Sequence, residues 1–186
     1  VYDLGCSNAI TLETLGSALA VAGKDVQLVG IDYSEAMLEK ARLRLAGVAQ
    51  HRPPRLMYGD LNNACEITNA SVVVLNLTLQ FIRPLFRDRV IRAIYDGLNE
   101  NGCLILVEKV LGNDSLFNRL FIKFYYDMKR RNGYSEVEIA QKREALENVL
   151  IPYRPDENVA LLKGAGFRQV DEFFRWYNFC GLIAVK

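Results

Sequence analysis

The chain has few of the residues that build metal sites and disulfide frameworks. Its 186 residues include one histidine and four cysteines, and no two cysteines stand close together in the sequence. Scattered cysteines argue against both a zinc site and a set of disulfides, and they fit a reducing compartment. We therefore expect a cytoplasmic protein without a bound metal.

Charge of one sign and long apolar runs are equally scarce. The formal net charge is +1 at pH 7, so nothing predicts nonspecific attraction to nucleic acid or to a membrane surface. The longest apolar stretch, 72–82, is interrupted by Asn76, Thr78 and Gln80 and is too short to cross a bilayer. We expect no direct nucleic-acid binding, no membrane association and no signal segment. Because the chain opens inside a strand and without methionine, we also expect a missing N-terminal segment.

Strands and helices alternate through the first part of the chain. A hydrophobic content of 51% over 186 residues is enough for one globular core. Apolar runs predict strands at 1–4, 26–31, 55–58, 71–75 and 103–107, and helical spacing predicts helices at 10–22, 35–45 and 84–98, the second with Ser34 as its N-cap. This alternation predicts an α/β fold with a doubly wound parallel sheet.

The second part of the chain departs from that alternation. Two helices, 114–129 and 135–150, follow each other without a strand between them, and Ser135 with Glu138 predicts a capping box for the second. Two consecutive helices in an alternating chain suggest an inserted lid or a surface that faces a partner. A further helix at 156–164 precedes strands at 167–174 and 176–185, which lie close enough in sequence to pair antiparallel.

Four strand ends carry the residues that point to a ligand. Gly5, Asp32, Asp60 and Asn76 follow or end the first four strands. Right-handed crossovers bring the carboxyl ends of parallel strands to one edge, where ligands bind. A glycine lets the backbone approach a ligand, and an aspartate at the next strand end can accept hydrogen bonds from both ribose hydroxyls. We therefore expect an adenosyl cofactor at this edge.

Each position also has a structural interpretation. Gly5 can simply make a turn, Asp32 can cap the following helix, and Asp60 can cap its own loop. In a cofactor site, the Asp60 carboxylate would accept a hydrogen bond from the adenine amino group, and the backbone of Leu61 would lie beside it. Asn76 ends a strand that we expect to be buried, where an unpaired amide costs roughly 1 to 3 kcal/mol. Either the amino-acid end of the cofactor or a backbone loop would satisfy that amide.

The turn after the first strand distinguishes between cofactor types. Gly5-Cys6-Ser7-Asn8-Ala9 lacks the spaced second and third glycines that let a pyrophosphate rest on a helix start. A nucleoside without phosphate fits better, and S-adenosylmethionine is the common one. The single histidine, His51, precedes the third strand and is expected at the opposite edge, which excludes a histidine general base.

Several motifs over nearly the whole chain share one resemblance. They are Asp3-Leu4-Gly5-Cys6-Ser7, Gly59-Asp60, Val73-Val74-Leu75-Asn76, Thr78-Leu79-Gln80-Phe81, Glu108-Lys109, Asp127 with Lys129-Arg130, Asn132-Gly133-Tyr134-Ser135-Glu136, Gln141-Lys142-Arg143 and Leu146-Glu147-Asn148-Val149. Together they resemble the carboxy-S-adenosylmethionine synthase family. The glycine and aspartate elements are shared with most class I methyltransferases, whereas the stretches at 132–136 and 141–143 are more particular to this family.

The resemblance implies a fold, a reaction and an assembly. The fold is Rossmann-like and of the class I methyltransferase type, a mostly parallel seven-stranded sheet with an antiparallel C-terminal pair, in one domain over 1–186 with a helical lid inserted at about 114–150. The reaction uses prephenate to convert S-adenosylmethionine into carboxy-S-adenosylmethionine, which a second enzyme transfers to the wobble uridine of transfer RNA. Carboxyl transfer of this kind needs no protein base if the departing group of the donor removes the methyl proton. Members of the family are homodimers.

The resemblance also assigns site residues. Gly5, Cys6 and Ser7 would surround the methionine part, Asp32 and Tyr33 the ribose, Asp60 and Leu61 the adenine, Asn76 the sulfonium arm, and Arg143 the added carboxylate. A guanidinium is a permanently charged fork that matches a carboxylate. Without the resemblance, Arg143 is interpreted as part of a solvated helix face.

Two departures from the family and two alternative functions remain. The turn after Ser7 is one residue shorter than usual and lacks the second glycine, and Tyr33 stands where the family often has asparagine. An ordinary S-adenosylmethionine-dependent methyltransferase is the first alternative, and a catalytically silent cofactor-binding subunit is the second.

The run Lys129-Arg130-Arg131 is expected to stabilise a helix end, with binding of prephenate or transfer RNA as its alternative. The aromatic side chains of the same helix are expected to pack rather than stack on bases, namely Phe121, Phe124, Tyr125 and Tyr126.

Overall fold

The computed structural model describes residues 1–47, 52–63 and 66–186, so His51 and Cys65 lie outside the described residues. These residues form a seven-stranded sheet with the order β3-β2-β1-β4-β5-β7-β6. Pairs among β1 to β5 are parallel, and β7 is antiparallel to both β5 and β6. The strands are β1 Tyr2–Leu4, β2 Val29–Asp32, β3 Arg55–Tyr58, β4 Ala70–Asn76, β5 Leu98–Lys109, β6 Gln169–Trp176 and β7 Phe179–Val185. The predicted α/β fold, with its antiparallel C-terminal pair, is confirmed.

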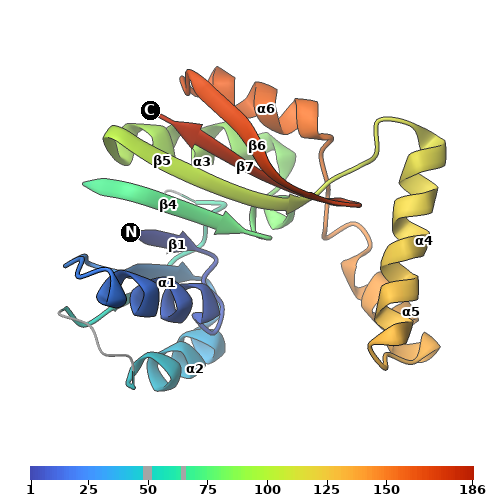
Figure 1. Ribbon diagram of the computed structural model, residues 1–186, viewed down its shortest axis with the longest axis horizontal. Coiled ribbons are helices and arrows are strands. Elements are labelled where there is room, and N and C mark those ends of the chain that lie inside the picture. The colour runs from blue at the N-terminus through green and yellow to red at the C-terminus, as the bar shows by residue number, and fades with distance from the viewer. Residues whose placement is uncertain (48–51, 64–65) are drawn as a thin grey trace.

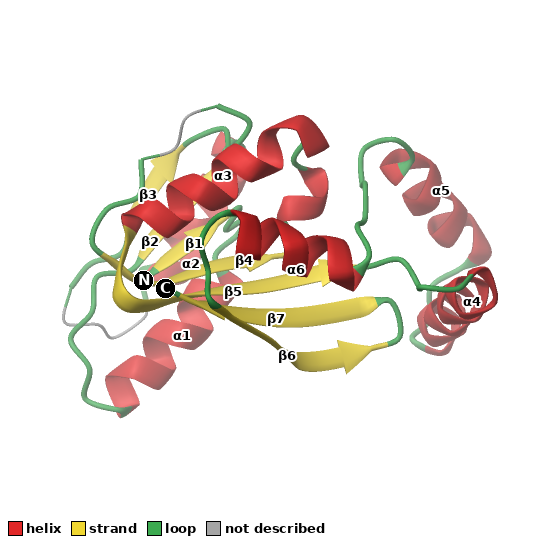
Figure 2. Ribbon diagram, turned by 90° about the horizontal axis from the view of Figure 1, so that it is seen from above, coloured by secondary structure: helices red, strands yellow, loops and turns green. Residues whose placement is uncertain are grey.

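Helices cover the two faces of the sheet unequally. Helices α1 (Ile10–Val21) and α2 (Glu35–Leu45) lie on one face, over the half of the sheet that holds β1 to β3. Helices α3 (Pro84–Gly97) and α6 (Pro155–Gly164) lie on the other face, as Figure 2 shows from above. A short 3-10 helix, η1 (Leu79–Phe81), follows β4. The sheet and its helices therefore make three layers.

The larger part of the core lies between the sheet and the α3–α6 layer. Side chains on one face of the sheet pack there against apolar residues of both helices. Val73, Leu104 and Leu182 of the strands, for example, share this cluster with Ile91 of α3 and Leu162 of α6. A smaller cluster joins α1 and α2 to the other face and includes Cys6, Leu12, Leu28 and Leu38. Nearly continuous apolar runs in β4 and β5 are typical of parallel strands that are covered on both faces.

One strand is longer than the sequence predicts. β5 begins at Leu98, directly after α3, whereas we expected a loop at 99–102 before a strand at 103–107. The early part pairs Ala70 with Leu98, and the register with β4 then shifts before Val72 pairs with Cys103. Such an irregularity lets a strand bend while it keeps its pairing, and the polar residues 99–102 hide this from a hydrophobicity pattern.

Two helices project from the sheet as an arm, which we define as residues 115–146. Helices α4 (Ser115–Arg131) and α5 (Glu136–Leu146) form it, close to the predicted bounds. They lie beyond the end of the sheet in Figure 1. The chain leaves β5 and returns before α6 at nearly the same place, because Val110 bridges Tyr153 and the amide of Leu111 donates to the carbonyl of Tyr153 at 3.0 Å.

A buried arginine fixes the base of the arm. The Arg87 side chain is 1% exposed. Its Nε donates to the carbonyl of Ile82 at 2.9 Å, and its Nη2 donates to the carbonyl of Ile151 at 2.7 Å. The guanidinium also lies 4.2 Å from the centre of the Tyr153 ring. Burial lowers the pKa of Arg87. The segment that follows the arm is thereby tied to the loop that follows β4.

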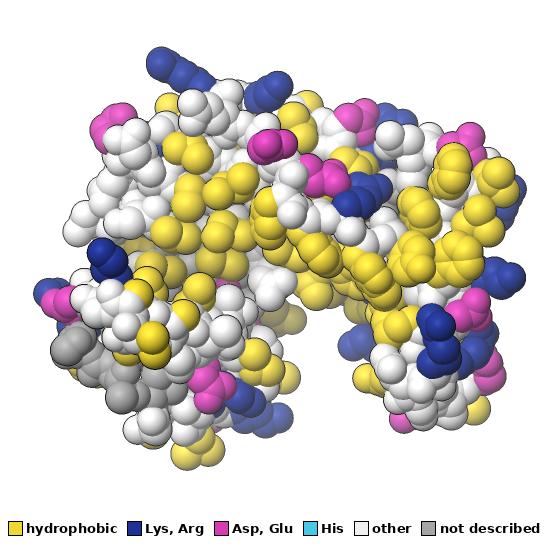
Figure 3. Space-filling model, viewed as in Figure 1, with side chains coloured by type: hydrophobic (Ala, Val, Ile, Leu, Met, Phe, Trp, Pro, Cys, Tyr) yellow, Lys and Arg dark blue, Asp and Glu magenta, His cyan; other side chains and the backbone are white. Residues whose placement is uncertain are grey.

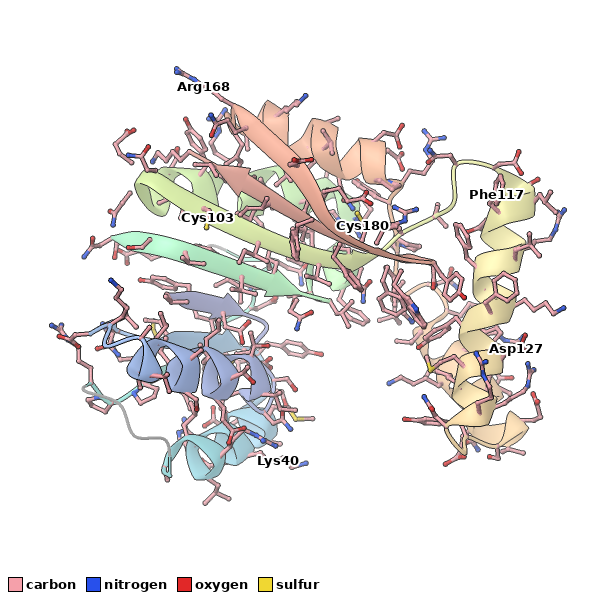
Figure 4. All side chains as sticks on the ribbon, viewed as in Figure 1. Lys40, Cys103, Phe117, Asp127, Arg168 and Cys180 are labelled. Atoms are coloured by element: carbon pink, nitrogen blue, oxygen red, sulfur yellow. The ribbon has the colours of Figure 1, made fainter. Side chains whose placement is uncertain are left out.

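Two further features bear on the chemistry of the molecule. Cys6, Cys103 and Cys180 are free thiols, and the last two lie on separate strands in Figure 4. No helix in the described part of the chain is long and apolar enough to cross a membrane.

Candidate functional site

The predicted ligand positions lie at one edge of the sheet. β1 pairs in parallel with β2 on one side and β4 on the other, so the direction of winding reverses at β1. A crevice opens outside the carboxyl ends of the strands at such a point, and ligands bind there. Gly5, Asp32, Asp60 and Asn76 follow or end β1 to β4 at this edge. The arm lies beyond the same edge in Figure 1.

Gly5 is required by its backbone and by its neighbour. Its φ is +75°, and a Cβ at this position would stand 2.5 Å from Cγ2 of Thr78, on the loop after β4. Its amide donates to the carbonyl of Ile31 at 2.8 Å, and the amide of Cys6 donates to the same oxygen at 3.0 Å. The turn is therefore locked to β2 and closely approached by the β4 loop, which brings three strand ends together.

Asp32 joins two of these loops. Its side chain is 7% exposed, Oδ2 accepts the amide of Ser7 at 2.8 Å, and Oδ1 accepts the amide of Ser34 at 2.9 Å. Asp32 thus holds Ser34, the residue that precedes α2, but the bond that it makes there is not a cap on an amide of the helix itself. Ser34 does occupy the N-cap position but makes no capping bond through its own side chain. Each carboxylate oxygen has a further lone pair, so the ribose assignment stays a prediction.

Asp3 is a buried acid that sequence reasoning did not select as a site residue. It lies within β1 and is 2% exposed, and its Oδ2 has no hydrogen-bond partner among the described residues. Burial and the charge of Asp32 raise the pKa of Asp3 to about 7. A charged residue inside an otherwise apolar strand was the available signal. The structure thus puts two acids beside the glycine turn, one of them with an unsatisfied oxygen.

The two residues after Gly5 are oriented differently. The Cys6 side chain is 5% exposed and packs in the smaller core cluster. Burial and the nearby charges of Asp3 and Asp32 raise the pKa of the Cys6 thiol to about 12, so it is no nucleophile at neutral pH. Ser7 is exposed, with φ at +50°. Of the two side chains, that of Ser7 faces away from the core and is available to a ligand.

Asp60 and Leu61 form a compact turn after β3. Oδ1 of Asp60 accepts from the backbone and side-chain amides of Asn62 at 2.9 and 3.0 Å, and Oδ2 accepts from the side chain of Asn63 at 3.2 Å. The loop-capping interpretation is therefore realised. The Leu61 side chain is buried and lines an apolar cavity with Leu4 and Val90. Any contact from Leu61 to an adenine must then come from its backbone, as we expected.

Asn76 and Tyr33 face solvent at the site edge. Asn76 is exposed, and its amide nitrogen lies 3.5 Å from Oγ1 of Thr11 on α1. Our expectation that this amide is buried was wrong, because the end of β4 emerges from the sheet where α1 begins. Tyr33 is 72% exposed beside Asp32. Both side chains are open to a ligand, and their assigned roles stay predictions.

A buried carboxylate supports the loop after β4. Glu108 on β5 is 3% exposed and accepts the amides of Thr78, Leu79 and Gln80 at 3.1, 2.9 and 2.8 Å. Burial raises the pKa of Glu108 to about 8, and these donors and Arg87 oppose the rise. Glu108 therefore fixes the loop that carries Thr78 against Gly5. Its place in the sequence, next to Lys109 at a strand end, gave no sign of this role.

Arg143 is the one predicted site residue that lies away from the strand ends. It is exposed on α5 and takes part in no hydrogen bond or ion pair within the described ranges. On α4, Arg130 pairs with Asp127 at 2.8 Å and with Glu136. The structure thus leaves the Arg143 guanidinium free of internal partners, and it does not bring Arg143 into contact with the glycine turn.

The residues beside the glycine turn are acidic. No group of three or more histidine, cysteine or acidic residues suited to a metal ion occurs among the residues the structure describes. Asp32, and Asp3 in its ionised form, offer negative charge and hydrogen-bond acceptors in a buried position. Such a site favours a ligand that carries positive charge and donor groups.

Comparisons with known proteins agree with this geometry. A family model described as a methyltransferase domain matches residues 2–104. A protein of Methylococcus capsulatus named carboxy-S-adenosyl-L-methionine synthase is 57% identical over 186 residues, which cover all of this chain and 76% of that protein. A protein of the same name from Desulfotalea psychrophila is 46% identical over the whole chain and 75% of its own length.

Solved structures share the fold at much lower identity. The S-adenosylmethionine-dependent methyltransferase SibL in its apo form superposes with a TM-score of 0.67 at 18% identity, over all of this chain and 49% of that one. An O-methyltransferase family 2 protein from Planctomyces limnophilus, in complex with apigenin, gives a TM-score of 0.69 at 18% identity, over all of this chain and 50% of that one. The chain spans about half the length of these two structures and matches their class I methyltransferase fold.

Proposed function

The chain belongs to the carboxy-S-adenosyl-L-methionine synthase family, and from that premise we propose that it is an enzyme that converts S-adenosylmethionine into carboxy-S-adenosylmethionine. We propose one domain over residues 1–186 with the helical insertion at about 114–150. We also propose that the protein acts in the cytoplasm as a homodimer and that its product serves the modification of the wobble uridine of transfer RNA by a second enzyme.

The observation that carries this proposal is the pair of acids beside the glycine turn. S-adenosylmethionine carries a positive sulfonium, a positive ammonium and a ribose with two hydroxyls. Asp3 presents an unpartnered buried oxygen and Asp32 keeps free lone pairs, so both complement such a ligand. Gly5 lets the loop with Thr78 approach the turn closely, which brings these loops together at the site. A dinucleotide fits less well, because the turn lacks the spaced glycines on which a pyrophosphate rests.

The remaining site residues follow from the loops they occupy. Gly5, Cys6 and Ser7 would lie along the methionine part, and Asp32 and Tyr33 along the ribose. Asp60 and the Leu61 backbone would face the adenine, with Asn76 near the sulfonium. Arg143 would hold the added carboxylate; in a homodimer, it would reach the site of either its own subunit or its partner's.

The proposed reaction joins a carboxyl group to the sulfonium methyl carbon. Prephenate would supply that group: its carbon–carbon bond to the carboxyl carbon breaks as the ring becomes aromatic, and phenylpyruvate is formed. The ring hydroxyl departs with the proton of the methyl group as water, so atoms and charge balance without a protein base. The chain's own contribution is to bind and orient anions, for which an unpaired guanidinium such as that of Arg143 is suited.

The mass of the bound ligand tests the proposal. Protein purified from cells is expected to carry a nucleoside that is heavier than S-adenosylmethionine by one carboxyl group, and incubation with S-adenosylmethionine and prephenate should release phenylpyruvate. An Arg143→Ala variant should lose the carboxylated form selectively, and Arg119→Ala, a change on the neighbouring helix α4, is the control. No phenylpyruvate from the wild-type protein would reject the function.

An ordinary methyltransferase is the second candidate, favoured by the match of residues 2–104 to a methyltransferase domain. In that case the purified protein would carry plain S-adenosylmethionine or its demethylated product. The same mass measurement therefore separates the two functions.

A further inference from the structure

Two lysines lie over aromatic rings where the arm meets the sheet, and the charge of a third, the exposed Lys142, acts on Lys109. Lys109 ends β5, Lys129 lies on α4 and Lys142 lies on α5. The ammonium of Lys109 is 4.7 Å from the centre of the Tyr125 ring, and that of Lys129 is 5.1 Å from the same ring. Two positive charges thus share one tyrosine. We call this set, with Tyr134 and Phe179, the lysine–tyrosine cluster.

The rings of the cluster are held in place from two sides. Lys109 also lies 5.6 Å from the centre of the Phe179 ring, and Lys129 lies 5.7 Å from that of Tyr134. The rings of Tyr125 and Phe179 are 5.5 Å apart, which packs α4 against the β6–β7 hairpin. Phe121 and Phe124 pack on Tyr177 of the same hairpin at 6.0 and 5.3 Å. The aromatic residues of α4 therefore pack, as expected, and they give the cluster a fixed frame.

The cluster lacks the carboxylates that would neutralise it. Within residues 1–47, 52–63 and 66–186, no acidic side chain forms an ion pair with Lys109, Lys129 or Lys142. Burial, together with the charges of Lys129 and Lys142, lowers the pKa of Lys109. The contrast with Arg130, next to Lys129, is direct: that guanidinium has two carboxylate partners. Like charges left together in a half-buried place are unfavourable unless an anion joins them.

The cluster lies beside the candidate site. Asn76 pairs with Val107 of β5, two residues before Lys109, and alternate residues of a strand share one face. Asn76 and Lys109 therefore stand on the same face of the sheet, one strand apart. The amide of Lys109 donates to Oε1 of Gln80 at 3.0 Å, which joins the end of β5 to the loop after β4. In Figure 4, Asp127 marks the neighbouring turn of α4.

We propose that the lysine–tyrosine cluster is the subsite for the carboxyl donor, a small acid with two carboxylates and a ring. This inference rests on the proposed function, which requires such an acid next to the cofactor. The ammonium groups bind the carboxylates, and the faces of Tyr125 and Tyr134 pack on the ring. Lys129 is thus assigned to the substrate, and the neighbouring Arg130 to the structure of the arm.

Steady-state kinetics of the full chain tests the subsite. Lys109→Met and Lys129→Met keep the apolar stem and remove the charge. Each is expected to raise the KM for prephenate by about tenfold or more, the usual loss when a charged hydrogen-bond partner is removed. The KM for S-adenosylmethionine should stay unchanged. Lys123→Met, an equal change of charge at an exposed position of the same helix, should alter neither value.

Calorimetric titration with prephenate separates this inference from the proposed function. Binding that weakens in Lys129→Met supports the subsite even if the wild-type protein forms no phenylpyruvate, an outcome that would reject the function alone. Turnover by the wild type with equal prephenate KM in Lys109→Met, Lys129→Met and Lys123→Met would overturn the subsite and leave the function standing.

Discussion

The first turn tolerates glycine alone at position 5, because both the backbone and the neighbouring loop demand it. We predict that Gly5→Ala lowers the free energy of unfolding by about 2 to 4 kcal/mol, from the left-handed φ and the collision with Thr78. Gly23→Ala is the matched control: its φ is +66° but no atom lies within 4 Å of the added Cβ. That variant should lose about 1 to 2 kcal/mol. Equal losses of unfolding free energy in Gly5→Ala and Gly23→Ala, measured by urea denaturation, would show that the close approach of Thr78 does not contribute to the loss.

Asp3 makes the stability depend on pH. Its folded pKa of about 7 lies above the ordinary value of 3.8, so the protonated form is favoured by folding. Its contribution to the free energy of unfolding is fully present below pH 3.8 and is lost as the pH rises to 7. The loss is roughly 4 kcal/mol, because each unit of difference in pKa corresponds to about 1.36 kcal/mol. We predict that Asp3→Asn removes this part of the decline in urea denaturation from pH 4 to 8 and leaves the part that comes from Glu108, whose pKa is raised to about 8.

An exposed acid provides the comparison for Asp3. Asp88→Asn changes the same charge at the surface of α3 and should leave the pH profile of the wild type intact. A profile of Asp3→Asn as steep as that of the wild type between pH 4 and 7 would mean that Asp3 does not contribute to the decline. The part that comes from Glu108 should extend to about pH 8.

At the level of elements, the sequence predicted both the capping box of α5 and the N-cap position of α2, but only the first forms its side-chain hydrogen bonds. Ser135 accepts the amide of Glu138 at 3.3 Å, and Glu138 accepts the amide of Ser135 at 2.8 Å. We predict that Ser135→Ala speeds amide exchange in α5 by about fivefold, the loss of a typical N-cap. Ser34→Ala, at an N-cap position without a side-chain bond, should leave exchange in α2 nearly unchanged. Similar acceleration in both helices would contradict this account.

The alternation of strands and helices could be predicted because it depends on local patterns. A parallel strand such as β2 is buried on both faces and therefore appears as an apolar run, and each helix carries its own period. The end of β4 could not be predicted in the same way. Asn76 follows five apolar or small residues and is exposed all the same, because exposure at a strand end depends on which helix covers it.

The site could be predicted at its loops but not at its charges. Gly5 and Asp32 stand next to apolar runs, and the rule for strand ends finds them. Asp3 was not predicted as a site residue, because whether a buried oxygen lacks a hydrogen-bond partner depends on how the folded chain packs. The lysine–tyrosine cluster was not predicted either, because Lys109, Lys129 and Lys142 come from three elements that meet only in the folded chain.

On the scale of the whole molecule, charge is divided between the two parts of the site. Asp3 and Asp32 lie by the glycine turn, and the lysine–tyrosine cluster lies at the base of the arm. A cationic nucleoside and an anionic acid would therefore each find the opposite charge, with the sulfonium between them. Such a division of charge would orient the two proposed substrates relative to each other.

The arm leaves apolar side chains in solvent, which supports the proposed homodimer. Phe117 on α4 is 54% exposed and Val137 on α5 is 63% exposed, and Figure 3 shows apolar surface on the arm and on the neighbouring hairpin. Apolar patches of this kind mark interaction surfaces, and the arm also carries Arg143, which a second subunit would bring to the shared site.

We predict that a glutamate on this surface dissociates the dimer. In sedimentation velocity, Phe117→Glu and Val137→Glu should each shift the protein from dimer to monomer, since a buried unpaired charge is costly at an interface. Val21→Glu is the control, because Val21 is 92% exposed on α1, away from the arm. It should leave the dimer intact. A monomeric wild-type protein, or a dimer that persists in both arm variants, would contradict this interface. Arg143 would then act in the site of its own subunit or have no role in the reaction.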